Sequence, residues 1–287
     1  MLAELFLQSA LAFLSREVPR WAQENHCYSC HNNGDAARAL YLARTRGYAV
    51  PDAALADTTA WLLTPAKWDE IQGAPAASDK KLARVQFSAA LAQAWRTGAI
   101  RDAQALRAAA QGLAKLQDPD GSWFIDTGGL PGAPATYGTA LATYLARGAL
   151  ETAGSVQFAY AIAQATRWLT AARPASTLDA SALLLASPDR ADCRQLLLAS
   201  QTSDGGWGVQ PKAPAEAFDT AMALLALRGQ GSAAVRGRAW LMKMQDAEGA
   251  WPETTRPAGA QSYAERISTA GWVVYALLET APAGKAP

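Results

Sequence analysis

A motif that recurs three times along the chain constrains its fold more than any other feature. Its copies are Gln117-x-x-x-Gly121-x-Trp123, Gln201-x-x-x-Gly205-x-Trp207 and Gln245-x-x-x-Gly249-x-Trp251. Their starts are 84 and 44 residues apart, which gives a period of about 42 to 44 residues with one degenerate copy near Trp168. A period of this length indicates one supersecondary unit per repeat, stacked on copies of itself.

Two kinds of helical segment alternate around these motifs. The segment before Gln117 has its apolar side chains on one face, which is typical of a helix on the outside of a protein. Segments 220–227 and 269–278 are apolar nearly all round and must be buried. Each inner segment opens with a small or capping residue, and these recur six times: Asp35, Ser88, Gly138, Asp179, Asp219 and Ser268.

Six outer-inner helix pairs predict an all-α fold, a closed α/α toroid with inner and outer helical rings. No interdomain linker is visible, so residues 1–287 are expected to form a single domain. Half of the residues are hydrophobic, which is enough for a sizeable core. The apolar residues 1–15 lack a preceding Lys or Arg and a small-residue cleavage site, so they predict a first helix of the fold, not a signal peptide.

Charge and hydropathy exclude two classes of partner. Lys plus Arg total 26 against 25 Asp plus Glu, with no basic block, so the electrostatic footprint of a nucleic-acid-binding protein is missing. The longest apolar stretches are shorter than the roughly 20 residues that a membrane-spanning helix needs. We therefore expect no nucleic-acid partner and no membrane span.

The Gln-x-x-x-Gly-x-Trp turns and the sequence Phe218-Asp219-Thr220-Ala221 resemble the repeats of squalene-hopene cyclases and prenyltransferase β-subunits. The turn motifs cover residues 100–280, and the first hundred residues match in pattern only. The resemblance implies that these turns tie outer helices to the following inner helices. It also implies a central funnel that holds isoprenoid chains. Three residues near inner-helix starts are candidates to line its mouth: Tyr137, Asp219 and Glu265.

The active-site motifs of those relatives are missing. Class II terpene cyclases protonate an alkene with an Asp-x-Asp-Asp-Thr-Ala motif, and here Phe218 takes the place of the proton donor. Asp219 is therefore expected to be a helix N-cap. The zinc site of a prenyltransferase needs cysteine and histidine in the toroid body, where only Cys193 is found, and we predict that Cys193 is a small buried residue on an outer helix.

The sequence Cys27-Tyr28-Ser29-Cys30-His31 has the spacing of a c-type haem attachment motif. With so few cysteines and histidines in the chain, the expected number of chance matches is about 0.00015. The motif predicts covalent haem on Cys27 and Cys30, with His31 as an axial iron ligand. It lies in a predicted haem-attachment loop, residues 26–34, at the place in the first repeat where later repeats carry the glutamine-tryptophan turn.

Two other chemical interpretations apply to the same segment. His26, Cys27, Cys30 and His31 are suitable ligand types for zinc, although neighbours in so short a segment cannot easily face one tetrahedral centre. A thioredoxin-like dithiol fits less well, because no strand pattern flanks the motif. Three cysteines do not make a disulfide framework.

The haem interpretation carries further expectations. Methionine is the usual partner of histidine in electron-carrying cytochromes c, and Met244 or Met242 is the candidate sixth ligand if the ring closes beside repeat one. Covalent haem attachment places the protein in the periplasm or otherwise outside the cytoplasm. The sequence thus predicts an electron-transfer or haem-based redox protein with a redox partner protein. The alternatives are an isoprenoid-binding or terpenoid-modifying toroid, and a scaffold with a structural zinc site.

Overall fold

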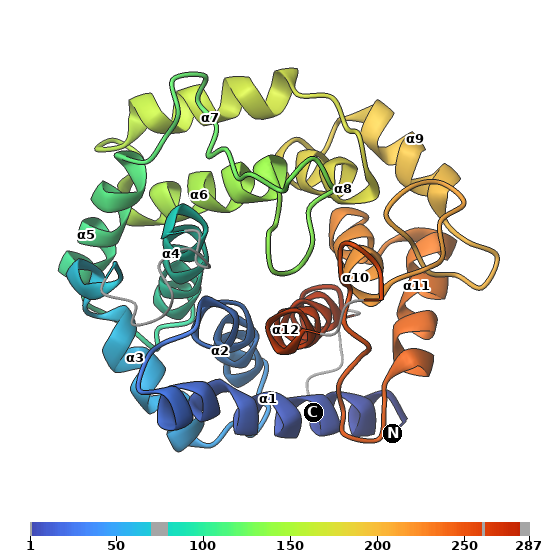
Figure 1. Ribbon diagram of the computed structural model, residues 1–287, viewed down its shortest axis with the longest axis horizontal. Coiled ribbons are helices and arrows are strands. Elements are labelled where there is room, and N and C mark those ends of the chain that lie inside the picture. Colours follow the sequence, from blue (N-terminus) through green and yellow to red (C-terminus); the bar gives the residue numbers. More distant parts are fainter. Residues whose placement is uncertain (1, 70–79, 260–261, 282–287) are drawn as a thin grey trace.

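The computed structural model describes residues 2–69, 80–259 and 262–281. Within these ranges the protein is helical and contains no strand. Twelve α-helices form two concentric rings, as Figure 1 shows, so the predicted α/α toroid with six helix pairs is confirmed. The outer ring contains α1 (Leu2–Asn25), α3 (Ala56–Leu62), α5 (Ala103–Ala114), α7 (Ala159–Ala171), α9 (Ala191–Ser200) and α11 (Gly231–Met244).

The inner ring consists of α2 (Ala37–Thr45), α4 (Lys80–Arg96), α6 (Thr139–Gly154), α8 (Thr177–Ala186), α10 (Ala217–Ala226) and α12 (Tyr263–Glu279). Each inner helix contacts the next, and α12 contacts α2, which closes the ring. Small side chains allow these helices to approach closely. A Cβ on Gly271 of α12 would lie only 2.9 Å from the Cα of Ala36, so this contact requires glycine.

The three glutamine-tryptophan turns hold the outer ring together by the same set of hydrogen bonds. Gln201 Nε2 donates to the carbonyl of Gly205 in its own turn and, at 2.8 Å, to the carbonyl of Ala233 in the next outer helix. Trp207 Nε1 donates at 2.7 Å to the carbonyl of Leu197 in the preceding outer helix. Each turn therefore connects two outer helices, in addition to the contact with the inner helix that the sequence resemblance implied.

The third turn closes the ring. Gln245 Nε2 donates at 3.0 Å to the backbone carbonyl of Phe6, so the last repeat is bonded to the first. A Cβ on Gly249 would lie 2.4 Å from the carbonyl oxygen of Ser9, and the positive φ of 88° at Gly249 also favours glycine. The N-terminal half of α1 is therefore the neighbour of α11 (Figure 1).

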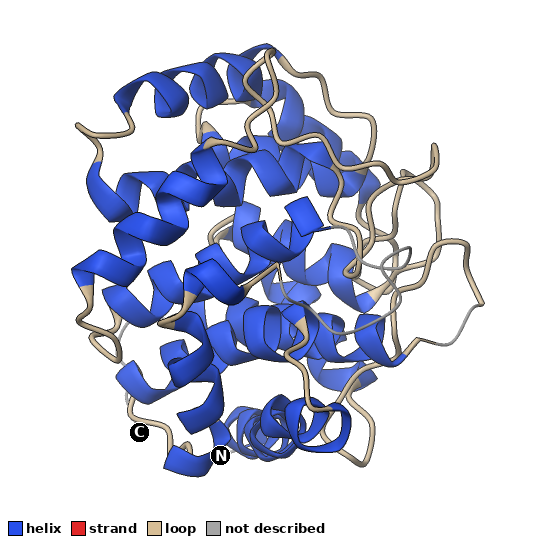
Figure 2. Ribbon diagram, turned by 60° about the vertical axis from the view of Figure 1, so that its left-hand side comes forward, coloured by secondary structure: helices blue, strands red, loops and turns tan. Residues whose placement is uncertain are grey.

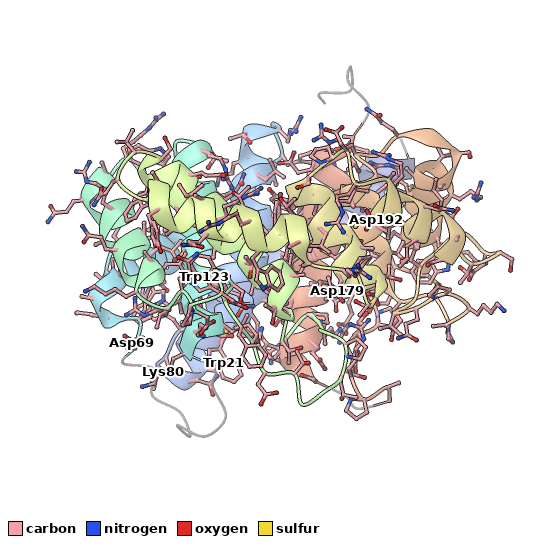
Figure 3. All side chains as sticks on the ribbon, turned by 90° about the horizontal axis from the view of Figure 1, so that it is seen from above. Trp21, Asp69, Lys80, Trp123, Asp179 and Asp192 are labelled. Atoms are coloured by element: carbon pink, nitrogen blue, oxygen red, sulfur yellow. The ribbon has the colours of Figure 1, made fainter. Side chains whose placement is uncertain are left out.

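Several long loops gather on one side of the rings, as Figure 2 shows. They include the segments that lead into α6, α10 and α12, which lie at the N-terminal ends of these inner helices. Figure 3 shows the rings from the side, with Asp179 at the start of inner α8 and Asp192 on outer α9. Cys193, next to Asp192, is fully buried on α9, as predicted, and burial raises the pKa of its thiol to about 11. No helix in the described ranges is both long and apolar enough to span a membrane.

Candidate functional site

The cysteine-histidine motif lies where the outer helix α1 gives way to the inner helix α2. Cys27 follows the end of α1, and Cys30 begins a π-helical turn, η1 (Cys30–Ala36), that leads into α2. Trp21 Nε1 donates to Cys27 Sγ at 3.3 Å, and Ser29 Oγ accepts the backbone N–H of His31 at 3.2 Å. Both cysteines are partly exposed, so the motif is held by local contacts but can be reached from solvent.

Two buried asparagines fix this turn against the outer ring. Asn32 Nδ2 donates at 2.7 Å to the backbone carbonyl of Glu17 in α1. Asn33 Nδ2 donates at 2.8 Å to Thr58 Oγ1 in α3, and its Oδ1 accepts the backbone N–H of Ser29 at 2.9 Å. The motif is thus built into the toroid wall.

His31 is oriented by a side chain from the other end of the chain. Its Nδ1 lies 3.0 Å from Ser268 Oγ of α12, and its Nε2 lies 3.8 Å from Cys30 Sγ. Burial lowers the pKa of the imidazole to about 4, so the ring is neutral at physiological pH. A neutral imidazole with one nitrogen fixed by a hydrogen bond is the form in which histidine ligates metals.

The described structure does not assemble the four-ligand zinc site of the alternative interpretation. In the described ranges, no three side chains of the His, Cys, Asp or Glu type are arranged to hold a metal ion. His26, the fourth zinc ligand of the alternative interpretation, is exposed and has a positive φ of 52°. The two cysteines and His31 are the residues that would hold a covalently attached haem.

The predicted sixth ligands lie far from the motif. Met244 ends α11, and its neighbour Gln245 is bonded to Phe6, near the start of α1. The motif follows the other end of this 24-residue helix, which is about 36 Å long at about 1.5 Å per residue. Repeat six does meet repeat one, but beside the motif it does so through Ser268 of α12, whereas α11 meets the opposite end of α1. The structure therefore does not bring Met244 or Met242 to His31.

A cavity of about 750 Å³ lies inside the inner ring. Leu145, Leu185 and Leu225 supply part of its wall, from α6, α8 and α10. Four aromatic residues also line it: Trp95, Tyr144, Trp272 and Tyr275. A second hollow of about 790 Å³ shares Tyr144, Leu185, Leu225 and Tyr275 with it, and is lined by the last residues of α2, α4 and α12. The two form one opening at the C-terminal ends of the inner helices.

Positive charge accompanies this apolar and aromatic wall. The first cavity is lined by one carboxylate, Glu151, and by four arginines, Arg38, Arg96, Arg101 and Arg147. Arg147 pairs with Glu151, with Arg147 Nε 3.4 Å from Glu151 Oε1. No ion pair to a carboxylate joins the other three in the described part of the chain. The cavity therefore combines an apolar lining with an excess of positive charge.

The three residues predicted to line the funnel mouth are placed elsewhere. None of them lines the cavity described above. Tyr137 is buried and its hydroxyl donates to Asp35. Glu265 lies in the first turn of α12, where burial raises its pKa to about 7. The expected mouth at the N-terminal ends of the inner helices is thus wrong for Tyr137 and Asp219, which are packed inside the protein.

Asp219 is also not the expected N-cap. It is the third residue of α10, is fully buried, and forms an ion pair with Arg256, which also contacts Glu216 at 3.1 Å. Burial is the largest influence on Asp219 and raises its pKa, whereas Arg256 opposes that rise. Arg256 further donates to the carbonyl of Gly132, so this ion pair fastens two of the long loops to α10.

The arginines of the cavity were not predicted from the sequence, although the sequence carries a signal for two of them. Arg38 and Arg147 each interrupt a run of apolar residues within an inner helix, residues 36–43 of η1 and α2 and residues 144–150 of α6. A charged residue at such a position must be paired or must face a cavity. Arg96 and Arg101 carry no such signal, because both lie at a helix end or in a loop, where arginine is common.

Comparisons with known proteins give the fold and no family. No family model matches the chain, and no curated protein matches its sequence. Among solved structures, a variant of a glycosidase has a TM-score of 0.66 with 13% identity, over 97% of both chains. A protein from Actinoplanes gives a TM-score of 0.60 with 14% identity, covering 98% of this chain and 100% of that chain.

A third similar structure is a variant of the type II terpene cyclase MstE from Scytonema in complex with geranylgeranyl dihydroxybenzoate. Its TM-score is 0.56, with 15% identity over 98% of both chains. At these identities the likeness establishes a shared architecture only. The chain is thus an α/α toroid of the same fold as a type II terpene cyclase and a glycosidase.

Proposed function

We propose that this protein binds an isoprenoid or similar apolar molecule in the cavity of the inner ring. The cavity itself carries the proposal: about 750 Å³ of space lined by leucine, tryptophan and tyrosine side chains at the centre of the toroid. This volume is typical of small-molecule sites. The terpene cyclase with the same fold was solved with a geranylgeranyl compound bound, which supports an isoprenoid as the ligand class.

Gly148 offers a direct test, because it lines the cavity and a Cβ placed there meets no atom within 4 Å. We expect Gly148→Phe to fill part of the cavity and weaken binding of farnesol or farnesoic acid by about tenfold or more, as expected for a steric block. Gly148→Ala is the matched control and should bind normally. Affinity is measured by tryptophan fluorescence and by the rise in melting temperature that a ligand of the folded state produces. Equal affinity of all three proteins for both probes, or no binding at all, would contradict the proposal.

A second proposed function is covalent haem attachment at Cys27 and Cys30, with His31 as the axial ligand. The orientation of His31 by Ser268 and the partial exposure of both cysteines favour it. Haem would supply one-electron redox chemistry, for which we propose a redox partner protein and a location in the periplasm or elsewhere outside the cytoplasm. Ser268 holds the Nδ1 side of the imidazole, so Nε2, which lies 3.8 Å from Cys30 Sγ, is the nitrogen that would bind the iron.

Expression with the cytochrome c maturation machinery, followed by denaturing electrophoresis and haem staining, tests this function. We expect the wild-type band to stain and a Cys27→Ser, Cys30→Ser double variant to lose the stain, because thioether bonds survive denaturation and coordination bonds do not. Cys193→Ser is the matched control, since this third cysteine is buried away from the motif, and its stain should persist. An unstained wild-type protein would refute haem attachment and leave ligand binding in the cavity untouched.

A further inference from the structure

Arg38 is the most unusual residue of the cavity. It lies on the inner helix α2 and lines the cavity, yet only 3% of its surface is exposed. Its guanidinium carbon lies 3.9 Å from the ring centroid of Trp272 and 4.5 Å from that of Tyr275. Both rings also line the cavity, so they hold the guanidinium at its wall by cation–π contacts.

Apart from these two rings, the guanidinium of Arg38 lacks direct partners for its charge in the described part of the chain. Its Nε and Nη2 are buried without a hydrogen-bond partner, and no carboxylate lies within ion-pair distance in the described part of the chain. Asp35 is the acid whose pKa it influences, but this carboxylate is already engaged by Tyr137 and Gln86. Burying a guanidinium whose N–H groups are unsatisfied destabilises a protein, so a site that retains one is a candidate for ligand binding.

The other three arginines of the cavity differ in their exposure to solvent and in their pairing. Arg96 and Arg101 are exposed and are not paired with a carboxylate in the described ranges, whereas Arg147 is largely buried and paired with Glu151. Arg96 donates to Thr152 and Gln93, which keeps it at the rim. An anion entering the cavity would thus meet positive charge first at the rim and then at the wall.

We propose that the ligand of this cavity is an amphipathic anion, with a terminal carboxylate or phosphate bound by Arg38 and an apolar body packed against Tyr144, Leu185 and Leu225. This inference rests on the proposed binding of an apolar molecule and adds the charge of its head group. Arg38 is then a binding residue whose N–H groups gain the partner that the protein does not supply. A guanidinium is suited to this role because its planar fork matches both anions.

Three probes with the same chain separate the head groups: farnesoic acid, farnesyl monophosphate and farnesol. We expect at least one of the two anions to bind wild-type protein about tenfold or more tightly than the alcohol, since hydrogen bonds to charged groups are the strong ones. Because Arg38→Gln weakens the binding of the anions much more than that of farnesol, it should remove this preference. Arg38→Lys, which keeps the charge but not the fork, should retain part of it.

Arg107→Gln is the control for loss of one positive charge, because Arg107 is exposed on the outer helix α5 and lines neither hollow. Melting curves of every variant without ligand establish that each is folded. Equal binding of the alcohol and both anions, with binding still weakened by Gly148→Phe, would overturn the anionic head group while sustaining the apolar ligand. An anion preference that survives Arg38→Gln would assign the anion to other arginines and overturn the role of Arg38.

Discussion

Replacing Trp207 by alanine is expected to destabilise the protein by about 3 to 5 kcal/mol, which is the usual cost of removing a buried tryptophan. Trp207 is completely buried. Gly237 of α11 packs directly against the indole, since a Cβ on Gly237 would lie 2.5 Å from Cζ3 of Trp207. Glycine has no side chain that could move into the space that the substitution leaves. The carbonyl of Leu197 also loses its indole donor. Chemical denaturation monitored by circular dichroism measures the change in unfolding free energy.

Trp168 is the control for this substitution. It belongs to the degenerate repeat, is only partly buried, and its indole N–H donates to the side chain of Asp120 at the surface. Trp168→Ala should therefore cost much less than Trp207→Ala. Trp207→Phe should lie between them, because it keeps most of the ring volume and loses the hydrogen bond. Similar losses for Trp207→Ala and Trp168→Ala would contradict the role given to the glutamine-tryptophan turns.

The toroid could be predicted because its repeat motif has a local physical basis. Each glutamine bonds to a carbonyl four residues later and to the next outer helix, so the same seven-residue pattern makes the same connection each time. The alternation of one-sided and fully apolar helices then fixes which ring each helix joins. The cysteine-histidine motif and Cys193 are equally local signals, so the sequence indicated their places between α1 and α2 and on the outer helix α9.

What could not be predicted depends on contacts between distant segments or on exact helix ends. Asp219 was expected to cap a helix, but α10 begins two residues earlier and the carboxylate pairs with Arg256 from another loop. Met244 was expected near His31 because ring closure places repeat six beside repeat one, yet α11 meets the end of α1 that is far from the motif. The charge of the cavity arises from arginines on several helices, and their convergence is a property of ring closure.

Asp35 should make the protein lose stability as the pH rises from about 4 to about 6. Burial raises the pKa of this carboxyl from 3.8 to about 6, outweighing Arg38 and the hydrogen bonds from Tyr137, Ser268 and Gln86. The folded state then holds the proton more tightly than the unfolded state, so the stabilisation is complete below the unfolded pKa. It is lost through this interval, by about 3 kcal/mol for a shift of about 2 units.

The difference between wild type and Asp35→Asn isolates this contribution, because burial also raises the pKa of Glu265 and Asp179, which act in the same direction. We expect the unfolding free energy of wild type, measured at several pH values, to fall relative to that of Asp35→Asn between pH 4 and 6. Asp189→Asn, at an exposed site between α8 and α9, controls for the change in net charge. Parallel curves for wild type and Asp35→Asn would mean that Asp35 is ionised in the folded protein at pH 4.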